Sequence, residues 1–182
     1  MVRKLKYHEK KLLKKVDFIS WECDNNIHEL KIMKRYGVRS REDYTKYNLL
    51  SREIRDLARK FNDLNDDDPL KINGTAQLLD KLYEMGLISH KSTLEVANKI
   101  TASSFCRRRL PCMMVKNKMS ERVKVSTQFI EQGHVRIGTE LILDPAYFVT
   151  RSMEDYVTWV DSSKIKQHIL EYNDMKDDFE GV

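Results

Sequence analysis

Residues 105–110 read FCRRRL, and residues 129–138 read FIEQGHVRIG. The first segment places three arginines directly before an apolar run, Leu110, Met113 and Met114, which has helical spacing. Guanidinium groups and the starts of helices both suit phosphate groups. This segment therefore predicts a helix that presents positive charge to a polyanion.

The second segment ends one helical pattern and starts a strand. Ser120 is a candidate N-cap, the apolar spacing from Val123 to Ile130 is helical, and Gly133 is a candidate C′ residue. After Gly133, Val135 and Ile137 alternate with His134 and Arg136. Further strands are predicted at residues 141–143, after a Gly138-Thr139 turn, and at residues 147–149 and 156–159. The pattern indicates two helices on a small sheet.

These residues resemble the S4 RNA-binding domain, a family named for ribosomal small-subunit protein four. The resemblance is carried by RRRL (107–110), FIEQGHVRIG (129–138) and DPAYFV (144–149). In that family the two helices and the Gly-His-Val turn form one face on structured RNA. With the two lysines between the helices included, the predicted RNA-binding residues are Arg107, Arg108, Arg109, Lys116, Lys118, Arg122, Lys124, His134 and Arg136.

The resemblance extends over nearly the whole chain. YNLLSREIRDLARKFNDLNDDDP (47–69) and LLDKLYEMGLI (78–88) resemble the helical part that precedes this domain in the eukaryotic ribosomal protein. WECDNN (21–26) and the ending from Val149 resemble a branch of the family that belongs to the U3 small nucleolar ribonucleoprotein. We therefore predict an α+β fold with a helical N-terminal region (1–106), an S4 domain (107–160) and a short helix with an acidic tail (161–182).

The resemblance also implies a function. It implies a non-enzymatic RNA-binding factor of ribosome biogenesis in the nucleus and nucleolus. Such a factor would bind a snoRNA of the U3 type and pre-ribosomal RNA, aid their pairing and early pre-18S rRNA processing, and meet small-subunit processome proteins, including an Mpp10-like scaffold. The alternative is a structural ribosomal protein of the mature small subunit.

The charges are segregated along the chain, whose net charge is +5. Residues 1–60 carry 17 Lys/Arg against 9 Asp/Glu, and residues 107–136 carry 8 against 2, a net +6. Residues 61–106 carry 4 against 7, and residues 137–182 carry 4 against 10, a net −6. A +6 block that coincides with the proposed RNA face favours polyanion binding. The acidic ending weakens the alternative, because ribosomal proteins usually carry basic extensions.

The N-terminal segment RKLKYHEKKLLKKVDF (3–18) fits an amphipathic helix. Three functional interpretations compete: an arm that folds on RNA or protein, a nuclear or nucleolar address, and a calmodulin-like or membrane-surface helix. We favour the arm, with a solvated surface helix as the alternative. Elsewhere, helical spacing predicts packing helices at residues 51–64, 75–85, 92–100 and 164–170. The run Asp66-Asp67-Asp68-Pro69 should separate the first two.

The sequence contains no recognisable catalytic or metal-binding motif. It has no Gly-rich phosphate loop with its lysine, no Gly-x-Ser-x-Gly, no HExxH and no CxxC. Its three cysteines favour neither a disulfide framework nor zinc. No apolar run approaches the roughly 20 residues that span a bilayer, and the start does not resemble a secretory signal. We expect no enzyme activity, cofactor, metal or membrane association; an RNA-modifying enzyme would need a catalytic domain, for which the predicted domains leave no room.

Overall fold

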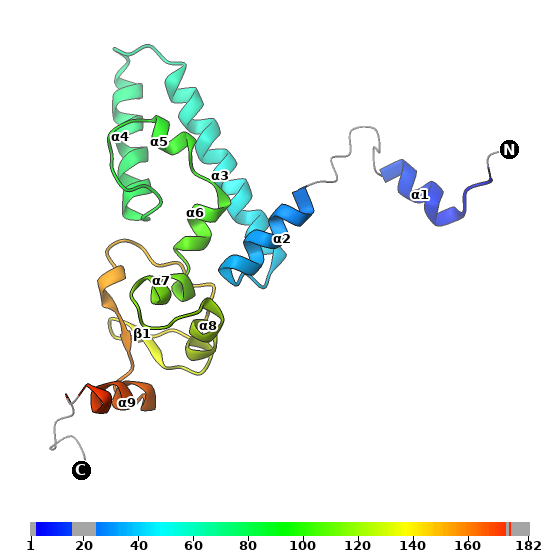
Figure 1. Ribbon diagram of the computed structural model, residues 1–182. Coiled ribbons are helices and arrows are strands. Elements are labelled where there is room, and N and C mark those ends of the chain that lie inside the picture. The colour runs from blue at the N-terminus through cyan, green and yellow to red at the C-terminus, as the bar shows by residue number, and fades with distance from the viewer. Residues whose placement is uncertain (1–2, 16–24, 174, 176–182) are drawn as a thin grey trace. The chain divides into compact units, whose positions relative to one another are not determined.

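The computed structural model describes residues 3–15, 25–173 and 175, and contacts divide the chain into units of residues 1–32 and 33–182 (Figure 1). The first unit contains α1 (Tyr7–Lys15) and the first turns of α2 (Asn25–Tyr36). In α1, Leu12 and Leu13 are about half exposed. The predicted helix is therefore confirmed from Tyr7 to Lys15, whereas residues 3–6 are not helical. Cys23 and residues 176–182 of the acidic tail lie outside the described part of the chain.

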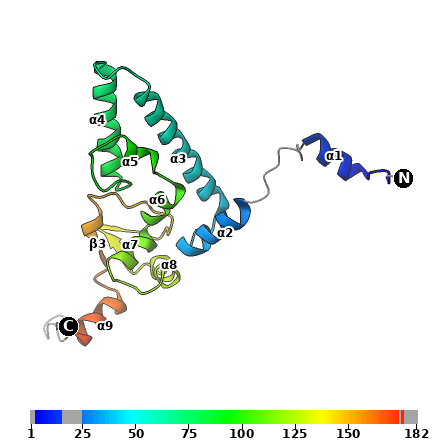
Figure 2. The same ribbon diagram turned by 45° about the horizontal axis from the view of Figure 1, so that its top comes forward.

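The second unit begins with a helical region, α3 to α6. The helices α3 (Arg41–Asn62) and α4 (Pro69–Glu84) run side by side in Figures 1 and 2 and are followed by α5 (Glu95–Asn98) and α6 (Ala102–Arg107). The Oδ1 atom of Asp68, the N-cap of α4, accepts a hydrogen bond from the backbone N of Leu70 at 2.9 Å, and Pro69 opens the helix. The predicted break between the helices is confirmed.

The helical region has its own apolar core. This core consists of the buried residues Ala58, Leu82, Ile88, Ala97, Ile100 and Phe105. Tyr47 stacks on Phe105, with ring centroids 5.6 Å apart. Leu57, an apolar residue of the packing helix predicted at residues 51–64, is 41% exposed. It lies beside Ala58 on the helix, and the buried face is centred on Ala58 instead.

The sheet module, α7 to β3, follows. It contains α7 (Leu110–Lys116), α8 (Val123–Glu131), β1 (Val135–Ile137), β2 (Glu140–Leu141), the 3₁₀ turn η1 (Glu154–Tyr156) and β3 (Val157–Trp159). The antiparallel sheet has the order β2-β1-β3. In its register Arg136 faces Leu141 on one side and Thr158 on the other. The α+β fold with two helices on a small sheet is confirmed, and α9 (Lys164–Tyr172) ends the described chain.

The core of the sheet module follows the predicted alternation. Val135 and Ile137 are buried with Leu110, Met113, Met114, Ile130, Ile142, Val149 and Val157. Gly133 follows α8 with φ +76°, a left-handed backbone conformation that glycine adopts without a Cβ penalty. The prediction that Gly133 stops this helix is confirmed.

Four local predictions were wrong, two of them only in the bounds of a strand. Ser120 does not cap α8: Arg122 holds that position, and the Ser120 hydroxyl hydrogen bonds to Ser126 Oγ at 2.5 Å. The strand predicted at residues 141–143 does not extend beyond Leu141, where β2 ends. The strand predicted at residues 156–159 lacks Tyr156, which belongs to η1. Residues 147–149 pair with the backbone of residues 108–110 as an isolated bridge, because the N–H groups of Leu110 and Val149 donate to Tyr147 O and Arg108 O.

The domain boundaries at residues 106/107 and 160/161 stay predictions. Both apolar cores lie in the unit of residues 33–182. Within the described ranges, none of the helices has the length and apolar character needed to cross a bilayer.

Candidate nucleic-acid interface

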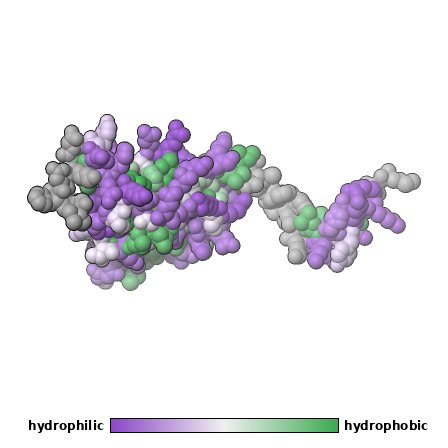
Figure 3. Space-filling model, turned by 90° about the horizontal axis from the view of Figure 1, so that it is seen from below, coloured by the Kyte–Doolittle hydropathy of each residue, from purple (hydrophilic) through white to green (hydrophobic). Residues whose placement is uncertain are grey.

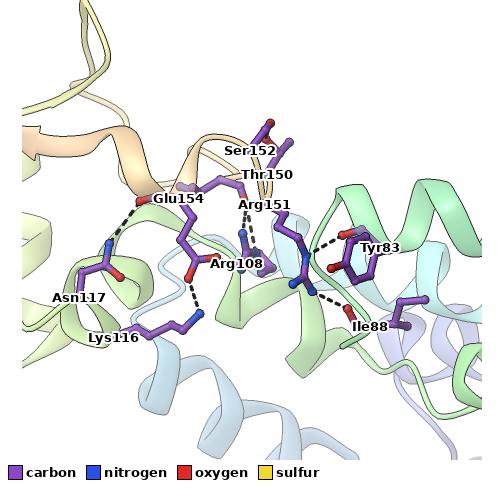
Figure 4. Close-up of polar contacts among 10 residues, drawn as sticks. Tyr83, Ile88, Arg108, Lys116, Asn117, Thr150, Arg151, Ser152 and Glu154 are labelled. Carbon is purple, nitrogen blue, oxygen red and sulfur yellow. Dashed lines mark hydrogen bonds and ion pairs between the residues drawn. The ribbon is translucent and has the colours of Figure 1, made fainter. Parts of the chain in front are cut away.

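The nine predicted RNA-binding residues fall into three settings, and Arg108 represents the first. Its side chain is 8% exposed, and its Nε and Nη2 donate to the carbonyl oxygen of Val149 at 3.0 and 2.9 Å. Its Nη1 donates to Glu154 Oε2 at 2.9 Å (Figure 4). Arg108 therefore uses its guanidinium group inside the molecule.

Glu154 joins Arg108 to a second predicted residue, Lys116. The Lys116 ammonium contacts Glu154 Oε1, and Asn117 Nδ2 donates to the Glu154 carbonyl at 3.4 Å (Figure 4). Burial alone would raise the pKa of Glu154, but hydrogen bonds from Lys116 and Arg108 overcome this effect and hold the pKa below its ordinary value. Glu154 therefore stays ionised and neutralises part of the predicted basic face.

Arg151, which we did not predict, holds the sheet module on the helical region. Its Nε and Nη2 donate to the carbonyls of Tyr83 and Ile88 at 3.1 and 2.8 Å (Figure 4). Its backbone N donates to Glu84 O at 2.8 Å, and its guanidinium carbon lies 3.9 Å from the centre of the Tyr83 ring. A cleft of about 380 Å³ lies beside this contact; its walls include Gly86, Ser104, Arg107, Lys116 and Glu154.

Arg109 is buried as well. Its side chain is 5% exposed, and its Nη1 lies 3.2 Å from Asp43 Oδ2 of α3. A buried guanidinium requires such a partner, because removal of its water is otherwise very unfavourable. The expectation that Arg107, Arg108 and Arg109 share one exposed face was therefore wrong. Arg107, the last residue of α6, is exposed, whereas its two neighbours connect parts of the fold.

The second setting is solvent. Arg107, Lys118, Arg122 and Lys124 are exposed, and none of them forms an ion pair with another described residue. Arg107 uses only its Nε, which donates to Ser103 O at 3.2 Å. Arg122 caps α8, and Lys124 lies in its first turn, where free backbone N–H groups add positive potential. In Figure 3 hydrophilic residues cover much of the visible face, with smaller apolar patches between them.

His134 and Arg136 form the third setting, on β1. Arg136 Nε donates to Thr158 Oγ1 at 3.3 Å, and its Nη1 lies 2.6 Å from Asp161 Oδ2. His134 Nδ1 lies 3.0 Å from Ser163 Oγ. Both residues are partly buried rather than displayed freely. They contact residues 158–163, which precede α9.

The α2–α3 turn brings a further cation to α8. Arg39 forms an ion pair with Glu131, and a Cβ on Gly37 would lie 2.9 Å from Val123 Cγ1. Arg39 is exposed, with a side-chain exposure of 68%. Sequence reasoning missed it because its partner lies 92 residues away. The only sequence signal for Arg39 was the excess of Lys and Arg over residues 1–60.

Comparison with known proteins shows the family to which this chain belongs. The family described as Ribosomal protein S4/S9 N-terminal domain matches residues 4–107. The chain is 56% identical over 181 residues to the U3 small nucleolar ribonucleoprotein protein IMP3 of Mus musculus, an alignment that covers 99% of this chain and 98% of the mouse protein. This chain belongs to the IMP3 family. The IMP3 protein of Saccharomyces cerevisiae is 52% identical, with 99% of both chains covered.

The predicted resemblance to a U3 ribonucleoprotein branch is thereby confirmed. The IMP3-family chain also retains the more distant ribosomal relationship. It is 28% identical over 151 residues to the small ribosomal subunit protein uS4 of Hyperthermus butylicus, with 83% of this chain and 85% of that protein covered. The names of these relatives describe ribonucleoprotein and ribosomal components.

The described cysteines of this IMP3-family chain have a structural setting. Cys106 is fully buried and Cys112 partly buried, and burial raises the pKa of both thiols to about 11. Such thiols remain protonated at neutral pH and behave as small apolar groups. Over the described ranges, no group of three His, Cys, Asp or Glu side chains is placed to hold a metal ion.

Proposed function

We propose that this protein is a non-enzymatic RNA-binding component of the U3 small nucleolar ribonucleoprotein in the small-subunit processome. The end-to-end similarity to IMP3 proteins, at 52–56% identity, is the observation that carries this proposal. The protein would act in the nucleolus, bind U3 snoRNA and pre-ribosomal RNA, and serve early processing of pre-18S rRNA. An Mpp10-like scaffold is the expected protein partner.

Within this proposal, the RNA contacts come first from the exposed cations. Arg107, Lys118, Arg122 and Lys124 can reach phosphates without losing an internal partner, whereas Arg108 and Arg109 would have to leave Glu154 and Asp43. Lys116 is 61% exposed and shares Glu154. We therefore assign Arg108 and Arg109 to the fold, and the exposed residues with Lys116, His134 and Arg136 to RNA.

A basic face of this kind supports pairing of two RNAs. Cations that neutralise phosphates on both strands lower the repulsion between the strands, and no nucleotide hydrolysis is required. About five contacts to single strands would give a slope of log K against log salt near −3.5. A nearly flat salt dependence would contradict this mechanism.

The test is crosslinking of the protein to RNA in cells, followed by sequencing of the bound RNA. The informative variant carries Lys118→Ala, Arg122→Ala and Lys124→Ala together. The matched control removes three exposed lysines of the helical region, Lys60, Lys81 and Lys99. We expect reads on U3 snoRNA and pre-ribosomal RNA that fall in the first variant and persist in the control.

The alternative function is that of a structural protein of the mature small subunit. The similarity to uS4 favours it at 28% identity. Reads confined to mature 18S rRNA, together with the protein in cytoplasmic subunits, would support this alternative and contradict the proposed assembly function.

A further inference from the structure

Asp161 lies between two cations that come from different elements. Arg136 of β1 places Nη1 2.6 Å from Oδ2 and Nη2 3.2 Å from Oδ1 of Asp161. Lys166 of α9 places Nζ 2.5 Å from the same Oδ1. A guanidinium fork and an ammonium group that converge on one anion are an arrangement that also suits a phosphate.

The cations are held in position by the fold. Thr158 of β3 accepts a hydrogen bond from Arg136 Nε at 3.3 Å. Ser163, only 4% exposed, caps α9 by accepting from Ile165 N at 3.3 Å, and its hydroxyl also contacts His134 Nδ1. The backbone N of Val160 donates to His134 O at 3.0 Å. These bonds hold the backbone segments from which Arg136 and Lys166 extend, and Thr158 also holds the Arg136 side chain without the help of Asp161.

The Asp161 side chain is more exposed than the two cations that it contacts. Its side chain is 61% exposed, whereas those of Arg136 and Lys166 are 34% and 35% exposed. Hydrogen bonding from Lys166 and the charge of Arg136 hold the pKa of Asp161 below its ordinary value, so the carboxylate is ionised at neutral pH. An exposed ion pair contributes little to stability and is weakened by salt, so another anion can replace this carboxylate.

We propose that Arg136, Thr158 and Lys166 form a phosphate-binding site for RNA, which Asp161 occupies until an RNA phosphate displaces its carboxylate. The inference rests on the proposed RNA-binding function and extends it in two ways. Lys166, outside the predicted set, becomes an RNA-binding residue. Asp161 becomes an internal competitor that lowers the affinity of this phosphate-binding site for RNA.

Neutralising Asp161 should release both cations to RNA. Binding should then tighten, and one additional phosphate contact should make the slope of log K against log salt more negative by about 0.7–0.9. A generic loss of one negative charge would also favour RNA binding, but it would not depend on Arg136 or Lys166.

The experiment measures the Kd of the full chain for an in-vitro transcribed U3 snoRNA over a series of salt concentrations. We expect Asp161→Asn to bind about fivefold more tightly than the wild type. Asp155→Asn is the matched control, because Asp155 is exposed, has no ion pair with another described residue, and its substitution changes the net charge equally; it should change the Kd less than twofold. Asp161→Glu keeps the carboxylate and should bind like the wild type, and thermal melts establish that each variant is folded.

A double-mutant cycle decides the mechanism. In a Lys166→Gln background, the gain from Asp161→Asn should fall below twofold, and Lys166→Gln alone should weaken binding. The inference is overturned if Asp161→Asn behaves like Asp155→Asn or weakens binding, or if its gain persists without Lys166. If the Lys118/Arg122/Lys124 variant loses RNA while the Asp161 and Lys166 variants do not differ from wild type, only this inference fails. If the wild type does not bind the transcript, the proposed function itself fails.

Discussion

Arg108 and Arg122 belong to the same basic block of the sequence, yet they lie in opposite environments. Arg108 is 6% exposed and bonds to Val149 O and Glu154 between the two apolar cores. Arg122 is exposed at the start of α8 and has no ion pair among the described residues. Equal charges therefore have different roles: the buried arginine stabilises the fold, and the exposed arginine remains available for an RNA phosphate.

The position of each residue relative to the two cores explains the difference. Phe105 belongs to the core of the helical region and Leu110 to that of the sheet module, so residues 106–109 cross from one core to the other. Among these residues, Cys106, Arg108 and Arg109 are shielded from water and must find partners within the protein, whereas Arg107 is exposed. Lys118, Arg122 and Lys124 of the α7–α8 turn and the first turn of α8 are exposed, so water solvates these cations.

The largest expected effect comes from Arg108→Ala. The substitution leaves the carbonyl of Val149 without its two side-chain donors and Glu154 without its buried partner. Breaking a buried pair in this way destabilises a protein by about 3–5 kcal/mol. Urea unfolding of the full chain, followed by circular dichroism, measures the loss.

Arg107→Ala is the matched control for this comparison. It removes the same type of side chain one residue away, but from an exposed site, so the free energy of unfolding should change by less than about 0.5 kcal/mol. Stabilities of the two variants within about 1 kcal/mol of each other would contradict the structural role of Arg108.

Gly86→Ala should have the next largest effect, because Gly86 lies against the same guanidinium group. Its φ is +71°, and a Cβ there would lie 2.6 Å from Arg108 Cζ. Gly138 has φ +60° and no atom within 4 Å of such a Cβ. Gly138→Ala therefore isolates the backbone strain, about 1–2 kcal/mol. We expect Gly86→Ala to lower the free energy of unfolding by about 1–3 kcal/mol more than Gly138→Ala does, because the added Cβ overpacks the site. The same urea experiment measures both variants. Equal losses would show that Arg108 moves aside freely.

Local patterns predicted the fold of the sheet module well. The spacing of Val123, Thr127 and Ile130, the stop at Gly133 and the alternation of Val135 and Ile137 depend on neighbours within a few residues. Backbone preference and burial act over the same short range, so the sequence displays them directly. The break at Asp68-Pro69 was predictable for the same reason.

The environments of the charged residues were not predictable in this way. Arg109 and Asp43 are 66 residues apart, and Arg151 reaches Tyr83 across 68 residues. Such pairs depend on how the helical region docks on the sheet module, and no periodicity in the sequence records that docking. The basic run RRRL was therefore interpreted as a single surface, although two of its arginines are internal.

Measurements of RNA affinity test the role of the exposed cations around Arg122. The combined Lys118→Ala, Arg122→Ala and Lys124→Ala variant should bind U3 snoRNA about tenfold more weakly, or about 1.4 kcal/mol. Its salt dependence should become less steep by about 2, because up to three phosphate contacts are lost. Filter binding of the purified protein gives both quantities. The free energy of unfolding should change by less than about 1 kcal/mol; a large loss of stability would place these residues with Arg108.

The last expected effect is the pH dependence of stability that Glu154 confers on the buried side. Because Lys116 and Arg108 hold its pKa in the folded protein below the unfolded value of about 4.3, Glu154 stabilises the fold above that pH. This contribution is lost as the pH falls through the lower, folded pKa, because the protonated carboxyl no longer attracts its two partners.

Glu154→Gln removes the titrating group. The difference in unfolding free energy between wild type and variant, about 1–3 kcal/mol at pH 6, should therefore shrink as the pH is lowered from 6 to 3. Glu140→Gln controls for the change in net charge, because Glu140 is exposed and forms no ion pair within the described part of the chain. If the Glu154 difference stayed constant over this range, its ion pairs with Arg108 and Lys116 would contribute nothing, and burial alone would distinguish Arg108 from Arg122.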